Sequence, residues 1–582
     1  MPDRPPLVRL DASGGDRFAS SWRFSGHVAT LEARQPAEVA NILDRVEKAA
    51  GEGLFAVGYV AYEAAAGLNP DLPPRSGVEG LPFAWFALYR QRHPAGDDEC
   101  PVEETAAPQL QPSLSLPEYD AAVEEIRSRI AAGESYQVNF TFPLNGTLGN
   151  EPLPLYNRIR AGQKAPFAAY LDTGRFVILS ASPELFFASR DGEITVRPMK
   201  GTAPRGRWTA EDRSLAAGLA ASPKERAENL MIVDLLRSDL GIVAETGTVT
   251  VDSLFDVERY PTVHQMTSTV SARFRSGTSL SDVFRALFPC GSVTGAPKRR
   301  SMEIIAGLEK SPRGVYCGAI GTVGPGGEAV FSVAIRTLLL DRADSRLTLN
   351  VGSGITWDSN PGAEYRECLA KGAFLHADNR PFQLIETMRR ENGTILRLDR
   401  HLARLAASAD YFGIPCDREK ALAMLASLPD CAGPVRLRLT LDAHGEFGLT
   451  TAPLVVDSTP VRLGMARVSV DPSDRFRYHK TSRRELLDGE RLGRSDCDEV
   501  LFANSRGELT EGSYHNLVLC LDGRLVTPAL GCGLLPGVLR EELLESGDIG
   551  EAILHPDDLE RAEEIWLINS LRGWRRAVMT QS

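Results

Sequence analysis

Short apolar runs and helix-like spacings follow one another along the chain without any repeat. The clearest apolar stretches predict buried strands, at residues 54–68, 81–90, 175–189 and 328–341. Residues 224–241 keep apolar side chains on one helical face, which predicts a helix. A second helix is predicted within residues 358–372, where Asn360 can cap its start and Gly372 can end it. Interleaved strands and helices predict an α/β (α+β) protein.

A polar, proline-containing break at residues 376–382 divides the chain. We therefore predict one domain at residues 1–376 and a second at 377–582, both of ordinary domain size. After the break, Asn392 and Gly393 predict a hairpin turn that leads into a helix ending near residue 414.

Composition excludes several classes of function. Of 582 residues, 43% are hydrophobic and 24% charged, which is typical of a globular protein. The net charge of −12 without a basic block argues against binding of nucleic acid or acidic lipid through the overall field. Because no apolar run reaches the ~18 residues of a membrane span, and the first residues do not form a secretory signal, we expect a cytoplasmic protein. The nine scattered cysteines, without a CxxC pair, are expected to be reduced thiols.

Lysine is scarce. The 65 basic residues include nine lysines, although a bias toward arginine alone could leave several by chance. Arginine stays charged and cannot act as a nucleophile or Schiff-base amine, so the remaining lysines are candidates for such chemistry. Lys200 precedes a glycine in a loop after a strand, and Lys480 lies between aromatic sequence and a helix. A surface role is the alternative for each, and Lys420 at a polar helix start is expected to be solvated.

Two helices each carry a pair of carboxylates three residues apart. These are Glu225 with Glu228 and Glu364 with Glu367. Oxygen ligands from two helices suit Mg²⁺, whereas a solvated helix face is the simpler explanation for either pair alone. The loop CGSVTGAPK at residues 290–298 precedes another helix, and its backbone amides could bind a carboxylate.

Seven motifs in order resemble the chorismate-utilising enzymes. They cover roughly residues 119–372: SPELF, PMKGTAPR, AENLMIVDLLRSDLG, CGSVTGAPK, YCGAIG, SVAIRT and GSGITWDSNPGAEYRECLAKG. The resemblance implies two large antiparallel sheets packed as a sandwich with helices outside. Lysine at position 200 is usual in aminodeoxychorismate synthases, whereas anthranilate synthases usually have alanine there.

The same resemblance implies roles for individual residues. Lys200 would be the nucleophile and Glu184 the general acid/base. Glu228 and Glu367 would be the main Mg²⁺ ligands, with Glu225 and Glu364 nearby. The substrate site would comprise His264, Thr294, Lys298, Tyr316, Arg336, Gly352, Ser353 and Gly354. No glutaminase domain is visible in the sequence, so ammonia is expected from a separate glutamine amidotransferase subunit.

Nearly all of residues 383–582 resembles fold-type IV pyridoxal-phosphate enzymes. The motifs include RHLARLAASADYFGI, HKTSRRE, DEVLFANSRGELTEGSYHNLVL and LVTPALGCGLLPGVLRE. The resemblance implies a two-subdomain fold with Lys480 as the Schiff-base lysine and Glu511 beside the pyridine nitrogen. It also implies that Arg404 and the amides of Val538 and Leu539 bind the phosphate. A homodimer through this domain is left open.

Fusion of the two domains favours an aminodeoxychorismate lyase over other fold-type IV activities. We therefore expect a bifunctional chain that makes 4-aminobenzoate, a folate precursor, from chorismate and ammonia. Three alternatives stay open: anthranilate or salicylate formation by the first domain, an aminotransferase in the second, and a second domain without catalysis.

Overall fold

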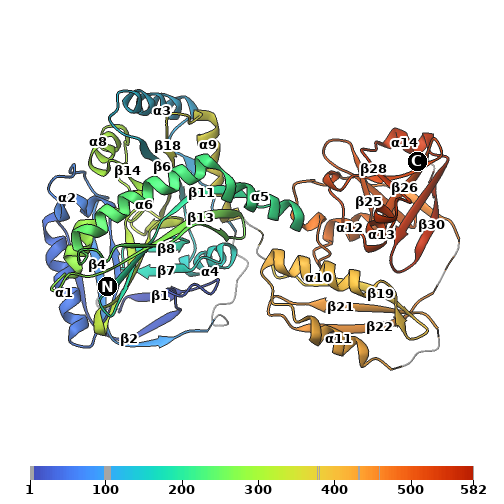
Figure 1. Ribbon diagram of the computed structural model, residues 1–582, viewed down its shortest axis with the longest axis horizontal. Helices are drawn as coiled ribbons and strands as arrows, with labels where there is room; N and C mark the ends of the chain where they lie inside the picture. Colours follow the sequence, from blue (N-terminus) through green and yellow to red (C-terminus); the bar gives the residue numbers. More distant parts are fainter. Residues whose placement is uncertain are drawn as a thin grey trace. The chain divides into compact units, whose positions relative to one another are not determined.

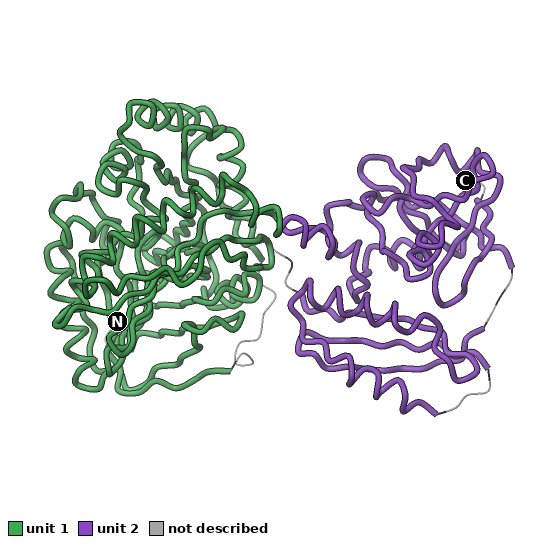
Figure 2. Tube along the Cα trace, viewed as in Figure 1, with its two compact units in different colours: residues 1–204, 216–379 green, residues 205–215, 380–582 purple. Residues whose placement is uncertain are grey.

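The computed structural model describes residues 5–96, 106–376, 378, 380–429, 433–455, 457 and 459–580. The chain forms two compact units, residues 1–204 with 216–379 and residues 205–215 with 380–582 (Figure 2). Ala377 and Asn379, beside the predicted domain boundary, lie outside the described residues. Within the described part of the chain, no helix has the length and apolar character needed to cross a bilayer.

Antiparallel strands build the first unit (Figure 1). They are β1 (Leu7–Asp11), β2 (Trp22–Ala33), β3 (Phe55–Val60), β4 (Ala84–Pro94), β5 (Gln111–Pro112), β6 (Gln137–Thr147), β7 (Phe167–Asp172), β8 (Phe176–Ser182), β9 (Leu185–Arg190), β10 (Glu193–Arg197), β11 (Met199–Pro204), β12 (Thr250–Arg259), β13 (Val263–Arg273), β14 (Gly295–Ala296), β15 (Ala319–Gly324), β16 (Glu328–Val333), β17 (Thr337–Asp341) and β18 (Arg346–Ile355). The short pairing of β1 with β2 joins two large halves of this sheet system.

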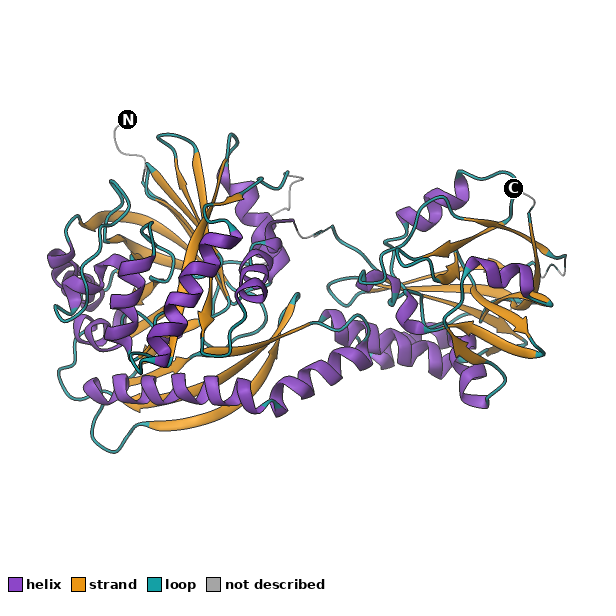
Figure 3. Ribbon diagram, turned by 90° about the horizontal axis from the view of Figure 1, so that it is seen from above, coloured by secondary structure: helices purple, strands orange, loops and turns teal. Residues whose placement is uncertain are grey.

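Helices cover the outer faces of the two halves (Figures 1 and 3). They are α1 (Val39–Gly51), α2 (Ala65–Leu68), α3 (Leu116–Ala131), α4 (Pro152–Gln163), α6 (Pro223–Val243), α7 (Leu280–Leu287), α8 (Lys298–Leu308) and α9 (Pro361–Ala370). Buried residues of β3, β4, β7 and β8, including Tyr59, Trp85 and Ile178, form a core between the halves. The predicted sandwich with outer helices is therefore confirmed.

Two predicted strands are each interrupted in the structure. The run at 175–189 forms β8 and β9 with Glu184 between them, and the run at 328–341 forms β16 and β17 with Arg336 between them. β8 pairs with β17 and β9 pairs with β16, so the two breaks lie at matching positions. Arg336 has a φ of 50°, which a regular strand does not permit. The expectation of continuous strands was wrong, because each run changes its pairing partner at the break.

The two predicted helices with paired carboxylates are confirmed. α6 starts at Pro223 behind the N-cap Ser222, whose side chain accepts a hydrogen bond from the Glu225 amide. α9 starts at Pro361 behind Asn360, whose side chain accepts from the Ala363 amide. Proline fits the first turn of both helices, where its missing N–H costs nothing.

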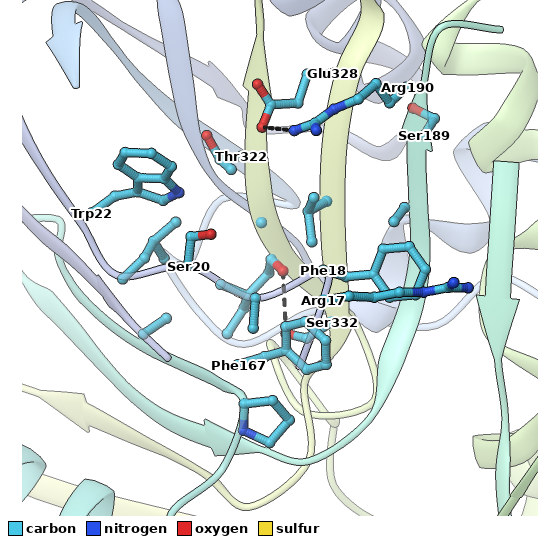
Figure 4. A pocket seen from close by; sticks show the side chains of 18 of the residues that line it. Arg17, Phe18, Ser20, Trp22, Phe167, Ser189, Arg190, Thr322, Glu328 and Ser332 are labelled. Carbon is cyan, nitrogen blue, oxygen red and sulfur yellow. Dashed lines mark hydrogen bonds and ion pairs between the residues drawn. The ribbon is translucent and has the colours of Figure 1, made fainter. Parts of the chain in front are cut away.

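A cavity of about 470 Å³ lies among β1, β2, β4, β7, β9 and β15 of the first unit. Trp22, Phe18 and Phe167 supply aromatic surface (Figure 4). Arg190 and Glu328 form an ion pair of 3.3 Å in its wall. None of the site residues predicted from the sequence lines this cavity.

The second unit contains a four-stranded and an eight-stranded sheet. Their strands are β19 (Leu384–Glu391), β20 (Thr394–Ile395), β21 (Val435–Leu441), β22 (Phe447–Pro453), β23 (Val461–Met465), β24 (Glu499–Ala503), β25 (Leu509–Gly512), β26 (Asn516–Leu521), β27 (Arg524–Pro528), β28 (Gly550–Ala552), β29 (Glu564–Asn569) and β30 (Gly573–Met579). The helices are α10 (Leu398–Phe412), α11 (Arg418–Ala426), α12 (Glu485–Leu492), α13 (Val538–Ser546) and α14 (Pro556–Arg561). Asn392 and Gly393 both have positive φ between β19 and β20, which confirms the predicted hairpin turn.

Residues 205–215 group with the second unit although they lie between β11 and α6 in the sequence. Arg205 pairs with Asp212 at 2.7 Å, and the Tyr411 hydroxyl donates to the Gly206 carbonyl at 2.7 Å. Helix α5 (Thr209–Ala221) starts in this segment. The apolar pattern of the sequence does not predict that residues 205–215 belong to the second unit.

Candidate active sites

A cavity of about 230 Å³ in the first unit collects most of the predicted residues. Those that line it are Glu184, Lys200, Glu225, Glu228, Tyr316, Arg336, Gly352, Gly354, Glu364 and Glu367. They come from the two strand breaks, β11, α6, the loop before β15, β18 and α9. Residues as far apart in the sequence as Glu184 and Glu367 therefore contribute to one site.

Lys200 lies on β11, and its side chain lines this cavity. Burial lowers the pKa of Lys200, as does nearby Lys371, whereas Glu228 and Glu184 oppose that shift. A Cβ at Gly354 would come within 2.3 Å of the Gln137 side-chain nitrogen and 2.8 Å of the Lys200 Nζ, so both side chains would have to shift. A lowered pKa increases the fraction of neutral amine, the form that can act as a nucleophile.

Glu184 is buried between β8 and β9. Its Oε1 accepts a hydrogen bond of 2.6 Å from the Ser292 hydroxyl, which belongs to the predicted loop at 290–298. Burial raises the pKa of Glu184 to about 7, although Ser292 and Lys200 oppose the shift. A carboxyl group with this pKa can donate and accept a proton near neutral pH. Ser292 was not among the predicted site residues, and the signal for it was its place in the glycine-rich loop.

Arg336 and Tyr316 supply polar groups to the same cavity. Burial lowers the pKa of Arg336 to about 10. Its Nη1 donates to the side-chain oxygen of buried Gln163, a residue that the sequence did not single out. Among the described residues no carboxylate pairs with this half-buried guanidinium, which favours an anionic ligand.

The four predicted metal ligands line the cavity from α6 and α9. Burial raises the pKa of Glu228. Burial alone would raise the pKa of Glu367, but the Lys371 ammonium, 2.8 Å from the Glu367 carboxylate, lowers it overall. Glu364 accepts a hydrogen bond of 2.8 Å from Ser359. Among the described residues, no three acidic, histidine or cysteine side chains converge on one point as a ready-made metal site.

Four predicted substrate-site residues do not line the cavity. The Lys298 ammonium pairs with Asp239 at 2.7 Å, and the Thr294 hydroxyl donates to the Cys290 carbonyl at 3.1 Å. Ser353 bonds with the Tyr119 hydroxyl at 2.9 Å, on the side of β18 opposite to the cavity. His264 is buried on β13, where it pairs with β11 and β12. Lys298, Thr294 and Ser353 therefore bond to other residues of the protein, outside the cavity lining.

A second cavity, of about 490 Å³, lies in the second unit and contains Lys480, Arg404, Glu511 and Val538. Burial lowers the pKa of Lys480 to about 8, and Arg404 and Arg484 add to this effect. Burial raises the pKa of Glu511 on β25 to about 7. By contrast, Lys420 pairs with exposed Glu446, which confirms its predicted surface role.

Arg404 is fixed beside this cavity by a buried carboxylate. Its Nε and Nη2 donate to Glu386 at 2.9 and 2.7 Å, and its Nη1 donates to the Pro536 carbonyl at 3.0 Å. Burial opposes ionisation of Glu386, but Arg404 and His401 lower its pKa to about 2. Glu386 was not predicted as a site residue, although it lies in the strand that opens the second unit.

Val538 and Leu539 are the first residues of α13, where backbone N–H groups lack partners inside the helix. Gly537 precedes them, and a Cβ there would come within 2.0 Å of the Asn516 side-chain oxygen. Val538 lines the cavity, whereas the Leu539 side chain packs against Val518 and Ile568 in the core. A helix N-terminus of this kind is a common anion site.

Two histidines in the wall of this cavity each have a buried nitrogen that lacks a partner among the described residues. They are the Nε2 atoms of His479 and His515.

Each unit thus encloses a lysine of lowered pKa together with carboxylates and arginines, the arrangement of a protein with two separate reaction sites. Residues 6–377 match the model of the chorismate binding enzymes, and the chain belongs to this family. Residues 383–578 match the model of the class IV amino-transferases.

Three curated relatives each match less than half of this chain. An aminodeoxychorismate synthase of Streptomyces pristinaespiralis is 46% identical over 258 residues, 44% of this chain and 36% of that protein. Aminodeoxychorismate synthase component 1 of Escherichia coli K12 is 40% identical over 45% of this chain and 57% of its own length. Anthranilate synthase component 1 of Streptomyces coelicolor is 43% identical over 44% of this chain and half of its own. The chain therefore spans less than two thirds of each of these relatives.

The crystal structure of anthranilate synthase component I from Streptococcus pneumoniae matches 62% of this chain and 93% of its own, with a TM-score of 0.54 and 24% identity. This likeness supports the fold of the first unit.

Proposed function

We propose that the chain converts chorismate and ammonia to 4-amino-4-deoxychorismate in the first unit and then to 4-aminobenzoate and pyruvate in the second. The observation that carries the proposal is the cavity in which Lys200, Glu184 and Arg336 meet, with a lowered pKa for the amine and a raised one for the acid. Anthranilate synthases are among the similar proteins, but Lys200 favours amination at the 4-position.

In the first step the neutral Lys200 amine attacks C2 of chorismate, the ring double bonds shift, and the C4–O bond breaks. Glu184 donates the proton with which the hydroxyl leaves as water. Ammonia then adds at C4 while the bond from C2 to Lys200 breaks, which restores the lysine. Arg336 and Tyr316 would hold a substrate carboxylate. We infer that the ammonia comes from a separate glutamine amidotransferase subunit.

Mg²⁺ suits the carboxylate-lined side of this cavity, where Glu228 and Glu367 would be ligands and substrate oxygens and water would complete the shell. Its chemistry there would be charge neutralisation at the substrate carboxylate. Glu225 and Glu364 would support it as neighbours.

Replacement of Glu228 by glutamine is expected to raise the Mg²⁺ concentration needed for half-maximal activity by about tenfold or more, because a charged ligand is lost. A Mg²⁺ titration of the first step measures this. The exposed Glu245→Gln variant serves as the control. An unchanged titration curve for Glu228→Gln would remove this residue from the metal site.

Pyridoxal phosphate fits the second cavity, because a half-buried lysine, a buried carboxylate and a helix N-terminus are present together with orphaned imidazole nitrogens. When bound, it supplies an electron sink for cleavage of a bond at the substrate's amine-bearing carbon. Arg404, Val538 and Leu539 would hold the phosphate, and Glu511 would pair with the ring nitrogen. Lys480 would carry the C4 proton while the C–O bond to the enolpyruvyl group breaks and pyruvate leaves.

The decisive experiment incubates the chain with chorismate, Mg²⁺ and ammonium, with and without pyridoxal phosphate, and identifies the products by mass spectrometry. We expect 4-aminobenzoate and pyruvate with the cofactor and 4-amino-4-deoxychorismate without it. A 2-amino product would support an anthranilate-type first step. A keto acid other than pyruvate would support an aminotransferase in the second unit.

The Ser292→Ala variant is expected to move the alkaline limb of the pH profile to higher pH. Ser292 donates to the Glu184 carboxylate and so lowers its pKa; without this bond the pKa rises above about 7 and the acid stays protonated longer. The profile of kcat/KM for the first step measures the shift, with exposed Ser113→Ala as the control. A limb at unchanged or lower pH would argue against Glu184 as the acid.

A further inference from the structure

Basic side chains dominate the wall of the second cavity. Its lining contains nine arginines and Lys480, against the three carboxylates Asp498, Glu499 and Glu511. Arg404 is bound to Glu386, and Arg484 pairs with Asp488 at 3.3 Å and donates to the Ser513 carbonyl. Arg477 and Arg575 also have carboxylate partners, Asp474 at 3.7 Å and Asp457 at 3.8 Å. Arg483 and Arg491 stack on the aromatic rings of Phe476 and Tyr514. Arg436, Arg438 and Arg572 remain, and like charges around one cavity are unfavourable without an anion.

Arg436 and Arg438 project from the same face of β21, two residues apart. The opposite face of the strand carries Val435, Leu437 and Leu439, which pack in the core beneath α10 and α11. Neither guanidinium forms a hydrogen bond or ion pair with the described part of the chain. In the sheet register Arg436 lies opposite Arg389, a like-charge pairing that does not stabilise the sheet. Both side chains are exposed on the face of β21 that lines the cavity, where they can reach a ligand.

Arg572 adds a third unpaired guanidinium, from the turn between β29 and β30. Its side chain has no partner among the described residues. Burial lowers the pKa of Arg572, and the charges of Arg575 and Arg436 lower it further, while Glu499 opposes them. Glu499 is itself bound to His515 at 2.7 Å, and the other ring nitrogen of His515 is buried without a partner in the described chain. Arg436, Arg438 and Arg572 therefore line one cavity from two different sheets, and few negative charges offset theirs.

The cofactor proposed for this cavity leaves these groups unused, since its phosphate is assigned to Arg404 and the start of α13. We propose that Arg436, Arg438 and Arg572 form a carboxylate subsite that makes the second unit selective for amino substrates with two carboxylates over those with one. The inference rests on the proposed function, because 4-amino-4-deoxychorismate carries one carboxylate on its ring and another on its enolpyruvyl group. An aliphatic α-amino acid with a single carboxylate would need an apolar wall in this place.

The first test measures pyruvate release from 4-amino-4-deoxychorismate by the full-length chain loaded with pyridoxal phosphate. Arg572→Gln and the double variant Arg436→Gln/Arg438→Gln are expected to raise KM about 10- to 100-fold, because each loses charge-assisted hydrogen bonds to substrate. Cofactor binding, followed by visible absorbance, should stay unchanged. Arg572→Lys should recover part of the loss. The control is Arg576→Gln, whose exposed side chain lies outside the cavity lining.

The second test separates this inference from the proposed function, since it needs no turnover. Benzene-1,3-dicarboxylate and benzoate are compared as ligands of the holoenzyme by calorimetry. The wild-type chain is expected to bind the dicarboxylate at least about tenfold more tightly, and the arginine variants should lose that preference. Equal binding of the two probes by the wild-type chain would overturn the inference even if 4-aminobenzoate is made. Absence of pyruvate with the preference retained would overturn only the proposed reaction.

Discussion

Replacing Lys200 by alanine is expected to reduce formation of the 4-amino product by about 10²-fold or more, because the chain loses its proposed nucleophile. With the amine gone, ammonia can attack C2 directly, so any residual amination should appear at the 2-position. The measurement is chromatography with mass spectrometry of products from chorismate, Mg²⁺ and ammonium. The acid limb of the wild-type pH profile should lie below the ordinary lysine pKa of about 10, since burial lowers the pKa of Lys200.

Two further variants make this test specific. Lys200→Arg retains the charge but not the nucleophile, so it should not recover activity. Lys310→Ala changes an exposed lysine that pairs with Glu118 at 3.2 Å, and it should behave like the wild type. A Lys200→Ala chain that forms the 4-amino product at an undiminished rate would exclude the covalent route.

Features set by local sequence were predictable. Asn360 and Pro361 define the start of α9 through capping and a fixed φ, and the Asn392–Gly393 turn follows from two positive φ angles. The resemblance to known motifs then drew attention to Lys200 and Lys480, which the structure places in separate cavities. Spacing alone did not distinguish these lysines from solvated ones.

Features set by distant partners were not predictable. An alternating apolar run looks the same whether its strand is continuous or breaks, so the irregularities at Glu184 and Arg336 depend on how β8 and β9 pair with β17 and β16. The bond between Lys298 and Asp239 joins residues 59 positions apart, and no spacing rule connects them. The arginines of the second cavity come from β21, the β29–β30 turn and the segment around Lys480, so their meeting appears only in three dimensions.

Replacing Lys480 by alanine is expected to stop the second step while leaving the first intact. Burial of its amine lowers the pKa of this half-buried lysine to about 8, so a substantial fraction is neutral near physiological pH and can take up and return a proton. Its loss should reduce 4-aminobenzoate and pyruvate formation by about 10²- to 10⁴-fold, the range typical of a lost proton carrier. Mass spectrometry should instead detect 4-amino-4-deoxychorismate accumulating from chorismate and ammonium, and the absorbance of bound pyridoxal phosphate should change.

Lys420→Ala is the matched control, because it alters the other lysine of the second unit, which pairs with Glu446 at the surface. This variant should retain both steps. If Lys480→Ala still produced 4-aminobenzoate at the wild-type rate, the second unit would not be the lyase, and a docking or assembly role would explain it better. Failure of both steps in Lys480→Ala would indicate a folding defect, because loss of the proton carrier alone leaves the conversion of chorismate intact.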